Sequence, residues 1–235
     1  MTTARLIPNR PAPARPGTSS SAALRIAYSD LATIAATLDE PDAWRPTRRA
    51  GWVVCDLLLH LLGDAQRGLV ALATPAAGPA DRDATTYWRN ARGDRDPEFR
   101  ELRAQRTIAS AWGLDALTRT FVDTSRAVVT LAGRTAPDAL VATQDHVLRA
   151  DDLITTLAVE AAVRHLDLVV DLGRPGPRAE PLALVRRTLD ALLGRPAPTE
   201  WSDEWWALLG TGREPLSGRE RRELGADAAL LPLLR

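Results

Sequence analysis

Three polar side chains follow one another along an otherwise apolar stretch near residue 60. His60 stands four residues before Asp64 and seven before Arg67. Residues with this spacing lie on one face of an α-helix, so an imidazole, a carboxylate and a guanidinium would share one polar strip. Imidazole and carboxylate groups bind divalent metal ions and also transfer protons. A half-buried histidine on a solvated helix face has the same spacing, and spacing alone favours this simpler interpretation.

A second polar strip surrounds Glu160. Arg164 and Asp167 follow it at spacings of four and three residues. Alternating charges of this kind are typical of exposed ion pairs worth about 0.3–0.5 kcal/mol each, and spacing alone again favours that interpretation. His165 lies five residues after Glu160, roughly 140° around a helix from it, among alanine and leucine residues. We therefore expect His165 to be a buried core residue.

The elements that must position these strips are helices. Apolar residues recur at helical spacing in five longer segments, at about residues 20–38, 52–73, 97–111, 114–131 and 151–172. Asp151 has the side chain of a good N-cap for the last of them. Almost no alternating strand pattern is present, and residues 133–149 are expected to form a loop with room for a short extended piece. The sequence therefore predicts an all-α fold.

The connections between these helices suggest how the chain is organised. Residues 74–95 are a long connection for a simple up-and-down bundle, which favours a crossover between the second and third bundle helices. Residues 1–19 carry few apolar side chains and are expected to be a disordered tail. We expect the bundle to span residues 20–178 and a small helical appendage to span residues 179–235. The tryptophans of the appendage are expected to pack it onto the bundle: Trp201, Trp205 and Trp206.

Composition narrows the class of protein. The 235 residues contain 30 basic and 30 acidic side chains, so no overall field favours nucleic acid or an acidic membrane surface. Every basic residue is arginine, which excludes a Schiff-base lysine, and the single cysteine, Cys55, excludes an intramolecular disulfide. No apolar run approaches the ~18 residues of a membrane span, and the first 20 residues do not read as a secretory signal. We expect a cytoplasmic monomer or homodimer that binds a small molecule.

Two longer motifs resemble a known family. The segment AGWVVCDLLLHLLGDAQRGLVAL resembles the second-helix signature of the mycothiol-dependent maleylpyruvate isomerase family, GW-x-V-x-D followed by apolar residues and H-L. The segment ATQDHVLRADDLITTLAVEAAVRHLDL resembles the family's fourth helix, with its pattern E-x-x-V-H-x-x-D-L. TYWR and GTGREPL…LGADAALLPLL resemble an actinobacterial subgroup. The resemblance covers most of the chain from Ser20 onward and implies a DinB-like four-helix bundle with a long crossover between helices 2 and 3.

The resemblance also implies a metal site. Family members bind a divalent metal, often zinc, through one histidine of the second helix and an E-x-x-x-H pair of the fourth, leaving a position for water or the thiolate of mycothiol. His60 matches the first histidine and Glu160 the glutamate, but Arg164 stands where the third ligand is expected. A guanidinium has no free lone pair for a cation. Either Arg164 replaces the charge of the metal, or a weaker site survives with His60, Glu160 and Asp64. We favour the metal-free site, because a metal ion beside a buried cation is costly without additional carboxylates.

The function implied is that of a transferase or isomerase that uses mycothiol as cosubstrate and acts on a small electrophilic metabolite. His60, Glu160 and Arg164 are the candidate catalytic residues. Three further residues are candidates for binding substrate: Trp88, Arg89 and Arg213. Two alternatives stay open, namely a biosynthetic enzyme that needs neither metal nor thiol, and a non-catalytic protein that binds a small molecule for resistance or sequestration. Full-length isomerases of the family carry a larger C-terminal domain, so isomerase activity itself is not carried over.

Overall fold

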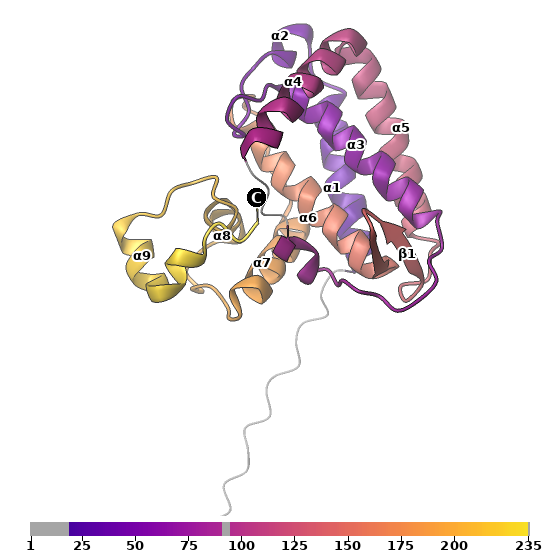
Figure 1. Ribbon diagram of the computed structural model, residues 1–235. Helices are drawn as coiled ribbons and strands as arrows, with labels where there is room; N and C mark the ends of the chain where they lie inside the picture. The colour runs from indigo at the N-terminus through magenta and orange to yellow at the C-terminus, as the bar shows by residue number, and fades with distance from the viewer. Residues whose placement is uncertain (1–18, 91–94, 235) are drawn as a thin grey trace, which may run out of the picture.

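The computed structural model describes residues 19–90 and 95–234, and this part of the chain is mostly helical (Figure 1). The helices are α1 (Ser20–Ala35), α2 (Glu40–Ala43), α3 (Val54–Leu72), α4 (Arg95–Trp112), α5 (Leu114–Ala132), α6 (Ala150–Val169), α7 (Ala179–Leu193), α8 (Asp203–Gly210) and α9 (Gly218–Leu224), with 3-10 turns η1 (Thr86–Asn90) and η2 (Gly225–Leu230). The helical fold predicted from the sequence is confirmed. Residues 1–18 of the expected tail lie outside the described residues.

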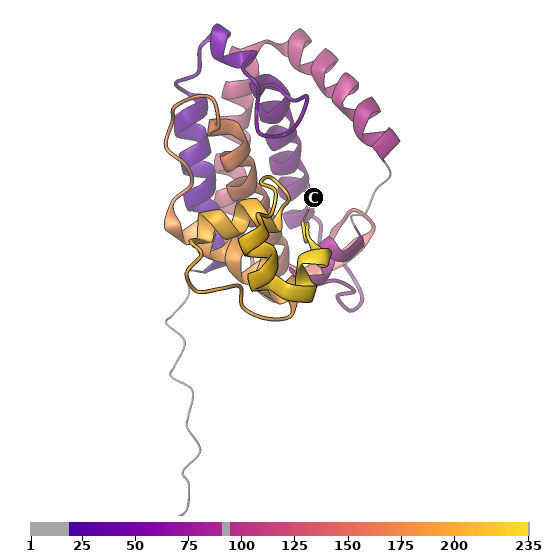
Figure 2. The same ribbon diagram turned by 90° about the vertical axis from the view of Figure 1, so that its left-hand side faces the viewer.

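Four long helices form the bundle. Helix α1 packs against α5 and α6, and α3 packs against the same two, so that α3 and α6 are neighbours. The long connection between α3 and α5 contains η1 and α4, and α4 packs against both helices that it links (Figures 1 and 2). The expected four-helix bundle with a crossover between its second and third helices is therefore confirmed. Its centre is filled by fully buried side chains, among them Leu24, Leu31, Leu57, Leu61, Leu117, Phe121 and Leu153.

Helices α3 and α6 approach each other closely at Gly68. A Cβ atom built on Gly68 would lie 2.7 Å from Cδ1 of Leu157 in α6, closer than two carbon atoms can approach without a shift. The glycine therefore allows the two helices that carry the polar strips to come together about two turns beyond His60.

A short β-hairpin precedes α6. Strand β1 (Leu140–Thr143) pairs with β2 (His146–Arg149) in antiparallel register around a turn at Gln144 and Asp145, both of which have positive φ. The beginning of the crossover is bonded to this hairpin, because Ala142 N donates to Thr74 O at 3.3 Å and Asp81 N to Val147 O at 3.0 Å. The extended piece expected in residues 133–149 is thus a hairpin that ties the end of α3 to the start of α6.

The expected N-cap of α6 is wrong. Helix α6 begins at Ala150, and its N-cap is Arg149, which makes no side-chain capping bond. Strand β2 runs directly into the helix, so no loop residue is left to act as a cap. Asp151 lies in the first turn, where a negative charge is favourable beside the helix dipole, and it accepts a hydrogen bond from the Ser20 hydroxyl at the start of α1.

Residues 179–234 continue from the bundle as α7–α9 and η2, on the side of the bundle that faces the viewer in Figure 2. Helix α7 packs against α1, α6 and α8. Trp206 is completely buried and donates from Nε1 to Asp190 Oδ1 at 2.9 Å, and its ring lies 5.6 Å from that of Trp201. Trp205 is 37% exposed. Two of the three tryptophans therefore hold α8 against α7. Among the described residues, none of the helices combines the length and apolar character that crossing a bilayer requires.

Candidate functional site

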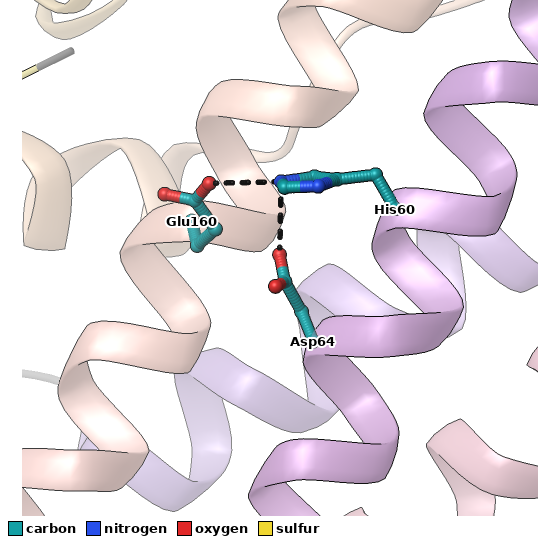
Figure 3. A group of neighbouring side chains, drawn as sticks. All are labelled: His60, Asp64 and Glu160. Carbon is teal, nitrogen blue, oxygen red and sulfur yellow. Dashed lines mark ion pairs between the residues drawn. The ribbon is translucent and has the colours of Figure 1, made fainter. Parts of the chain in front are cut away.

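The polar strips of α3 and α6 face each other (Figure 3). His60 Nε2 lies 3.5 Å from Asp64 Oδ2, one turn along the same helix, and 3.6 Å from Glu160 Oε1 on the neighbouring helix. The side chains of His60 and Glu160 are each 17% exposed and that of Asp64 only 4%. The interpretation of both strips as solvated faces is therefore wrong, and the three side chains form a half-buried group at the contact of α3 and α6.

Two atoms of this group have no hydrogen-bond partner among the residues that the structure describes. Both His60 Nε2 and Asp64 Oδ2 are buried, and the separations around the imidazole nitrogen exceed the length of a good hydrogen bond. Buried polar atoms are normally bonded, so two that converge mark a place for a bound ion or molecule. Ligand atoms bound tetrahedrally at about 2.0–2.2 Å lie roughly 3.3–3.6 Å apart, and the three ligand atoms here lie within 4.8 Å of one another. The donor set therefore fits a divalent cation.

Aromatic packing fixes the imidazole of His60. The ring of Trp52, fully buried just before α3, meets it edge to face at a centroid distance of 5.4 Å. The guanidinium of Arg49 lies over the Trp52 ring, with its central carbon 3.8 Å from the ring centroid. Asp56, one turn before His60, takes no part in the group, because it forms an ion pair with Arg106 of α4.

Arginines pair with every carboxylate around the site. Arg164 Nη2 donates to Glu160 Oε1 at 2.6 Å, and its Nη1 reaches Asp167 Oδ2 at 3.3 Å. Arg67 Nη2 bonds the other oxygen of Asp64 at 2.6 Å. The guanidinium of Arg164 thus lies along α6 between Asp167 and Glu160, where it bonds the Glu160 oxygen that faces His60.

The charge beside the group is compensated. Arg213, in the turn after α8, bonds both oxygens of Asp167 at 2.7 and 2.8 Å, and Asp167 is completely buried. Asp64 and Asp167 are additional carboxylates near Arg164, but each already pairs with an arginine, Arg67 and Arg213 respectively. A divalent cation would add positive charge that an anionic ligand would have to balance. The expectation of a metal-free site stays a prediction.

The two carboxyl groups of the site have pKa values displaced in opposite directions. Burial raises the pKa of Asp64 above its usual range. Burial acts in the same direction on Glu160, but the charge of Arg164 and the neighbouring His60 outweigh it and hold the pKa of Glu160 well below its usual range. Environments that separate two carboxyl pKa values are typical of functional sites.

Two tyrosines near the group were missed by the sequence analysis. Burial, followed by the charge of Asp64, raises the pKa of Tyr28, whose buried hydroxyl has no hydrogen-bond partner in the described part of the chain. Tyr87 of η1 is half-buried, and its pKa is also raised, first by burial. Tyr28 belongs to the apolar stripe of α1, and no sequence signal separates it from the core residues beside it.

The remaining candidates lie in different surroundings. Trp88 is half-buried with its ring 5.2 Å from that of Tyr87, and its Nε1 has no hydrogen-bond partner among the side chains and backbone that are described. Arg89 is exposed. The guanidinium of Arg213 is bonded to Asp167 and to Thr211 O, inside the protein. His165 is buried and donates from Nε2 to Pro175 O at 3.0 Å, as expected for a core histidine.

Fold and site together define a DinB-like helical bundle with a histidine–carboxylate group between its second and fourth helices. Residues 24–169 match the family described as the mycothiol maleylpyruvate isomerase N-terminal domain, and the chain belongs to this family. The matched region runs from α1 to the end of α6 and contains His60, Asp64, Glu160 and Arg164. Comparison with curated protein sequences and with solved structures found no match.

Proposed function

We propose that the chain is a mycothiol-dependent transferase or isomerase that acts on a small electrophilic metabolite, with a divalent cation held by His60, Asp64 and Glu160. The observation that carries this proposal is the convergence of His60 Nε2 and Asp64 Oδ2 on Glu160 of the neighbouring helix. Both atoms are buried and have no hydrogen-bond partner within residues 19–90 and 95–234 as described. Family membership supports the choice of mycothiol as the thiol.

The residues around the site have distinct tasks in this proposal. A bound divalent cation would supply positive charge that favours a thiolate over a thiol. Arg67 and Arg164 each bond one carboxylate oxygen and so fix how Asp64 and Glu160 face the imidazole. The hydroxyl of Tyr28 stays protonated because its pKa is raised, and it is a hydrogen-bond donor beside Asp64.

The chemistry that suits this site is addition of a thiolate to an unsaturated, carboxylate-bearing metabolite. A carbon–sulfur bond forms as the carbon–carbon π bond opens, and the resulting carbanion takes a proton. A transferase keeps this protonated conjugate. In an isomerase, rotation about the new single bond occurs, the same proton is removed again, and the electron pair left on carbon re-forms the π bond as the thiolate leaves. The thiolate and the substrate carboxylate are both negatively charged. A site that holds an additional cation attracts them electrostatically.

One observation favours a second candidate, a metal-free enzyme or binding protein. Glu160 Oε1 already accepts a strong bond from Arg164 at 2.6 Å, and this bond competes with coordination. In that case His60 and Asp64 act as a proton-transfer pair, or the site binds a metabolite without turnover.

Metal content separates the two candidates. We expect elemental mass spectrometry on the untagged full chain to find about one equivalent of a divalent metal, and the variants His60→Ala and Asp64→Asn to lose it. His146→Ala is the matched control, because His146 also pairs with a carboxylate, Asp81, at 2.9 Å but is not part of the group of His60, Asp64 and Glu160. A wild-type protein that is empty and takes up no zinc on titration would contradict the metal-dependent proposal.

Thiol consumption tests the chemistry. Mycothiol mixed with unsaturated carboxylates should disappear faster in the presence of wild-type protein, and His60→Ala should lower this rate by about 100-fold or more. Tight binding of a metabolite with no thiol consumed would favour the non-catalytic alternative.

A further inference from the structure

An unbroken series of ion pairs joins the C-terminal appendage to the site. Arg213 bonds Asp167 through two nitrogens, Asp167 also contacts Arg164, and Arg164 bonds the oxygen of Glu160 that faces His60. The side chains of Asp167, Arg164 and Arg213 are 0%, 6% and 10% exposed. Water therefore screens these contacts little, and a change at one of them is felt by the next.

We propose that Arg213 is a positioning residue that sets the orientation of Glu160 through Asp167 and Arg164. The inference rests on the proposed function only in that it treats Glu160 as part of the site. The appendage lies outside the region matched to the family. If the proposal holds, a residue of the appendage helps to position a side chain of the site on the bundle.

The bonds of Arg213 fit this role better than the substrate-binding role expected from the sequence. Its Nε and Nη2 bond the two oxygens of Asp167, and its Nη1 donates to Thr211 O at 3.2 Å. All three nitrogens are thus used within the protein, and the side chain is buried. A substrate carboxylate would have to displace Asp167, which would leave a buried carboxylate short of a partner.

Asp167 needs both of its arginines. A fully buried carboxylate is costly unless it is paired and hydrogen-bonded. Without Arg213, the nearest remaining cation is Arg164, which now divides its two terminal nitrogens between Asp167 and Glu160. Arg164 would then turn toward Asp167 and release Glu160 Oε1 from its bond.

The same turn also reaches the segment that leads into α3. Glu214, next to Arg213, forms an ion pair with Arg48, and Arg48 N donates to Asp167 O at 3.0 Å. The turn at residues 211–214 therefore contacts α6 itself and the segment that leads into α3. Helices α3 and α6 supply the residues of the site. A loss of Arg213 is expected to act on the site rather than on the appendage alone.

A double-mutant cycle on the full chain tests the proposal without requiring metal or thiol. Arg213→Met and Glu160→Gln are combined, and urea unfolding is followed by far-UV circular dichroism. The charge of Arg213 also lowers the pKa of Glu160 directly, so Arg213→Lys, which keeps this charge but loses the two-point contact with Asp167, is combined with Glu160→Gln in the same way. We expect the effects of Arg213→Lys and Glu160→Gln on the folding equilibrium constant to depart from multiplicative behaviour by about fivefold or more through Asp167 and Arg164. Multiplicative effects within about twofold would overturn the proposal.

Arg195→Met is the matched control. Arg195 lies in the same appendage and pairs with Asp227 and Leu224 O, away from Asp167. Its effect should multiply with that of Glu160→Gln within about twofold. If Arg213→Met does not fold, the cycle with Arg213→Lys decides alone.

The absorption spectrum of protein loaded with cobalt(II) gives a readout that a purely structural role would not change. Arg213→Met should shift the bands relative to wild type, because the position of Glu160 changes, whereas Arg195→Met should leave them unchanged. Identical spectra for wild type and Arg213→Met would overturn the proposal. If wild type binds no cobalt, the metal in the proposed function is wrong, and the cycle still decides the role of Arg213.

Discussion

Arg164 occupies the position at which the family pattern has a histidine, yet its guanidinium turns along α6 to Asp167 and Glu160. In the metal site proposed above, the third ligand is Asp64, on the helix that carries His60. One ligand would then have moved from the fourth bundle helix to the second, while Arg164 pairs with Glu160 and Asp167.

Returning a histidine to position 164 should strengthen the metal site and weaken the apo-protein. Arg164→His restores an E-x-x-x-H pair, so zinc affinity measured by competition with a chelator should rise by about tenfold or more. Loss of one member of a buried ion-pair network should lower the free energy of unfolding of the apo-protein by about 3 kcal/mol. Arg178→His, which breaks an exposed pair with Asp30, serves as control for both measurements. Weaker zinc binding by Arg164→His than by wild type would contradict the ligand assignment.

His165 should make the stability of the protein depend on pH. Burial lowers the pKa of His165, although the Pro175 carbonyl and Asp30 act in the opposite direction. Below about pH 6.5 the unfolded chain takes up a proton that the folded chain refuses, so the free energy of unfolding should fall as the pH drops from 6.5 toward the folded pKa.

Urea unfolding at pH 7.5, 6.5 and 5.5 measures this dependence. His165→Gln should flatten it, because each unit of pKa difference corresponds to about 1.4 kcal/mol. His146→Gln, at a half-buried histidine paired with Asp81, is the control. An unchanged slope in His165→Gln would show that His165 binds a proton in the folded state as easily as in the unfolded one.

The residues of the site divide clearly into those that sequence could identify and those that it could not. His60 and Glu160 follow from the family pattern, and Asp64 from helical spacing. The direction of Arg164 depends on Arg213, 49 positions further along the chain, and no local pattern encodes that contact. Tyr28 has the spacing of a core residue, and only the tertiary structure brings its hydroxyl near Asp64.

At the scale of elements, the contact of α3 with α6 decides whether the site forms. Gly68→Ala places a methyl group 2.7 Å from Leu157, so we expect a loss of about 1–3 kcal/mol in the free energy of unfolding and a wider separation of His60 from Glu160. Gly63→Ala in the same helix meets no atom within 4 Å and should stabilise by about 0.5–1 kcal/mol. Urea unfolding and metal content of both variants provide the comparison. Equal behaviour of the two variants would contradict the role given to the close approach.

The long helices were predictable to within three residues at either end, because each has a wide apolar stripe. The hairpin was not, since four-residue strands are too short for alternation to stand out. The expected N-cap at Asp151 failed for the same reason. A strand that leads straight into a helix removes the loop on which N-cap patterns depend.

At the scale of the whole molecule, the appendage should unfold together with the bundle. Trp206→Ala removes a completely buried side chain at the contact of α8 with α7, which itself packs on α1 and α6, and should cost about 3–5 kcal/mol. Trp205→Ala, at a 37% exposed neighbour, should cost about 1 kcal/mol or less. Far-UV circular dichroism and tryptophan fluorescence should report one common urea transition. Separate transitions by the two probes would mean that the appendage folds independently.

The hairpin that joins the start of the crossover to α6 determines where the chain tolerates added length. One residue inserted between Arg149 and Glu160 would rotate the glutamate by about 100° around α6 and away from His60. Residues added at the turn of Gln144 and Asp145 leave both strands, and hence α6, in place. Insertions of residues, in a laboratory library or among relatives of this chain, are therefore expected at the tip of the hairpin and not at its base.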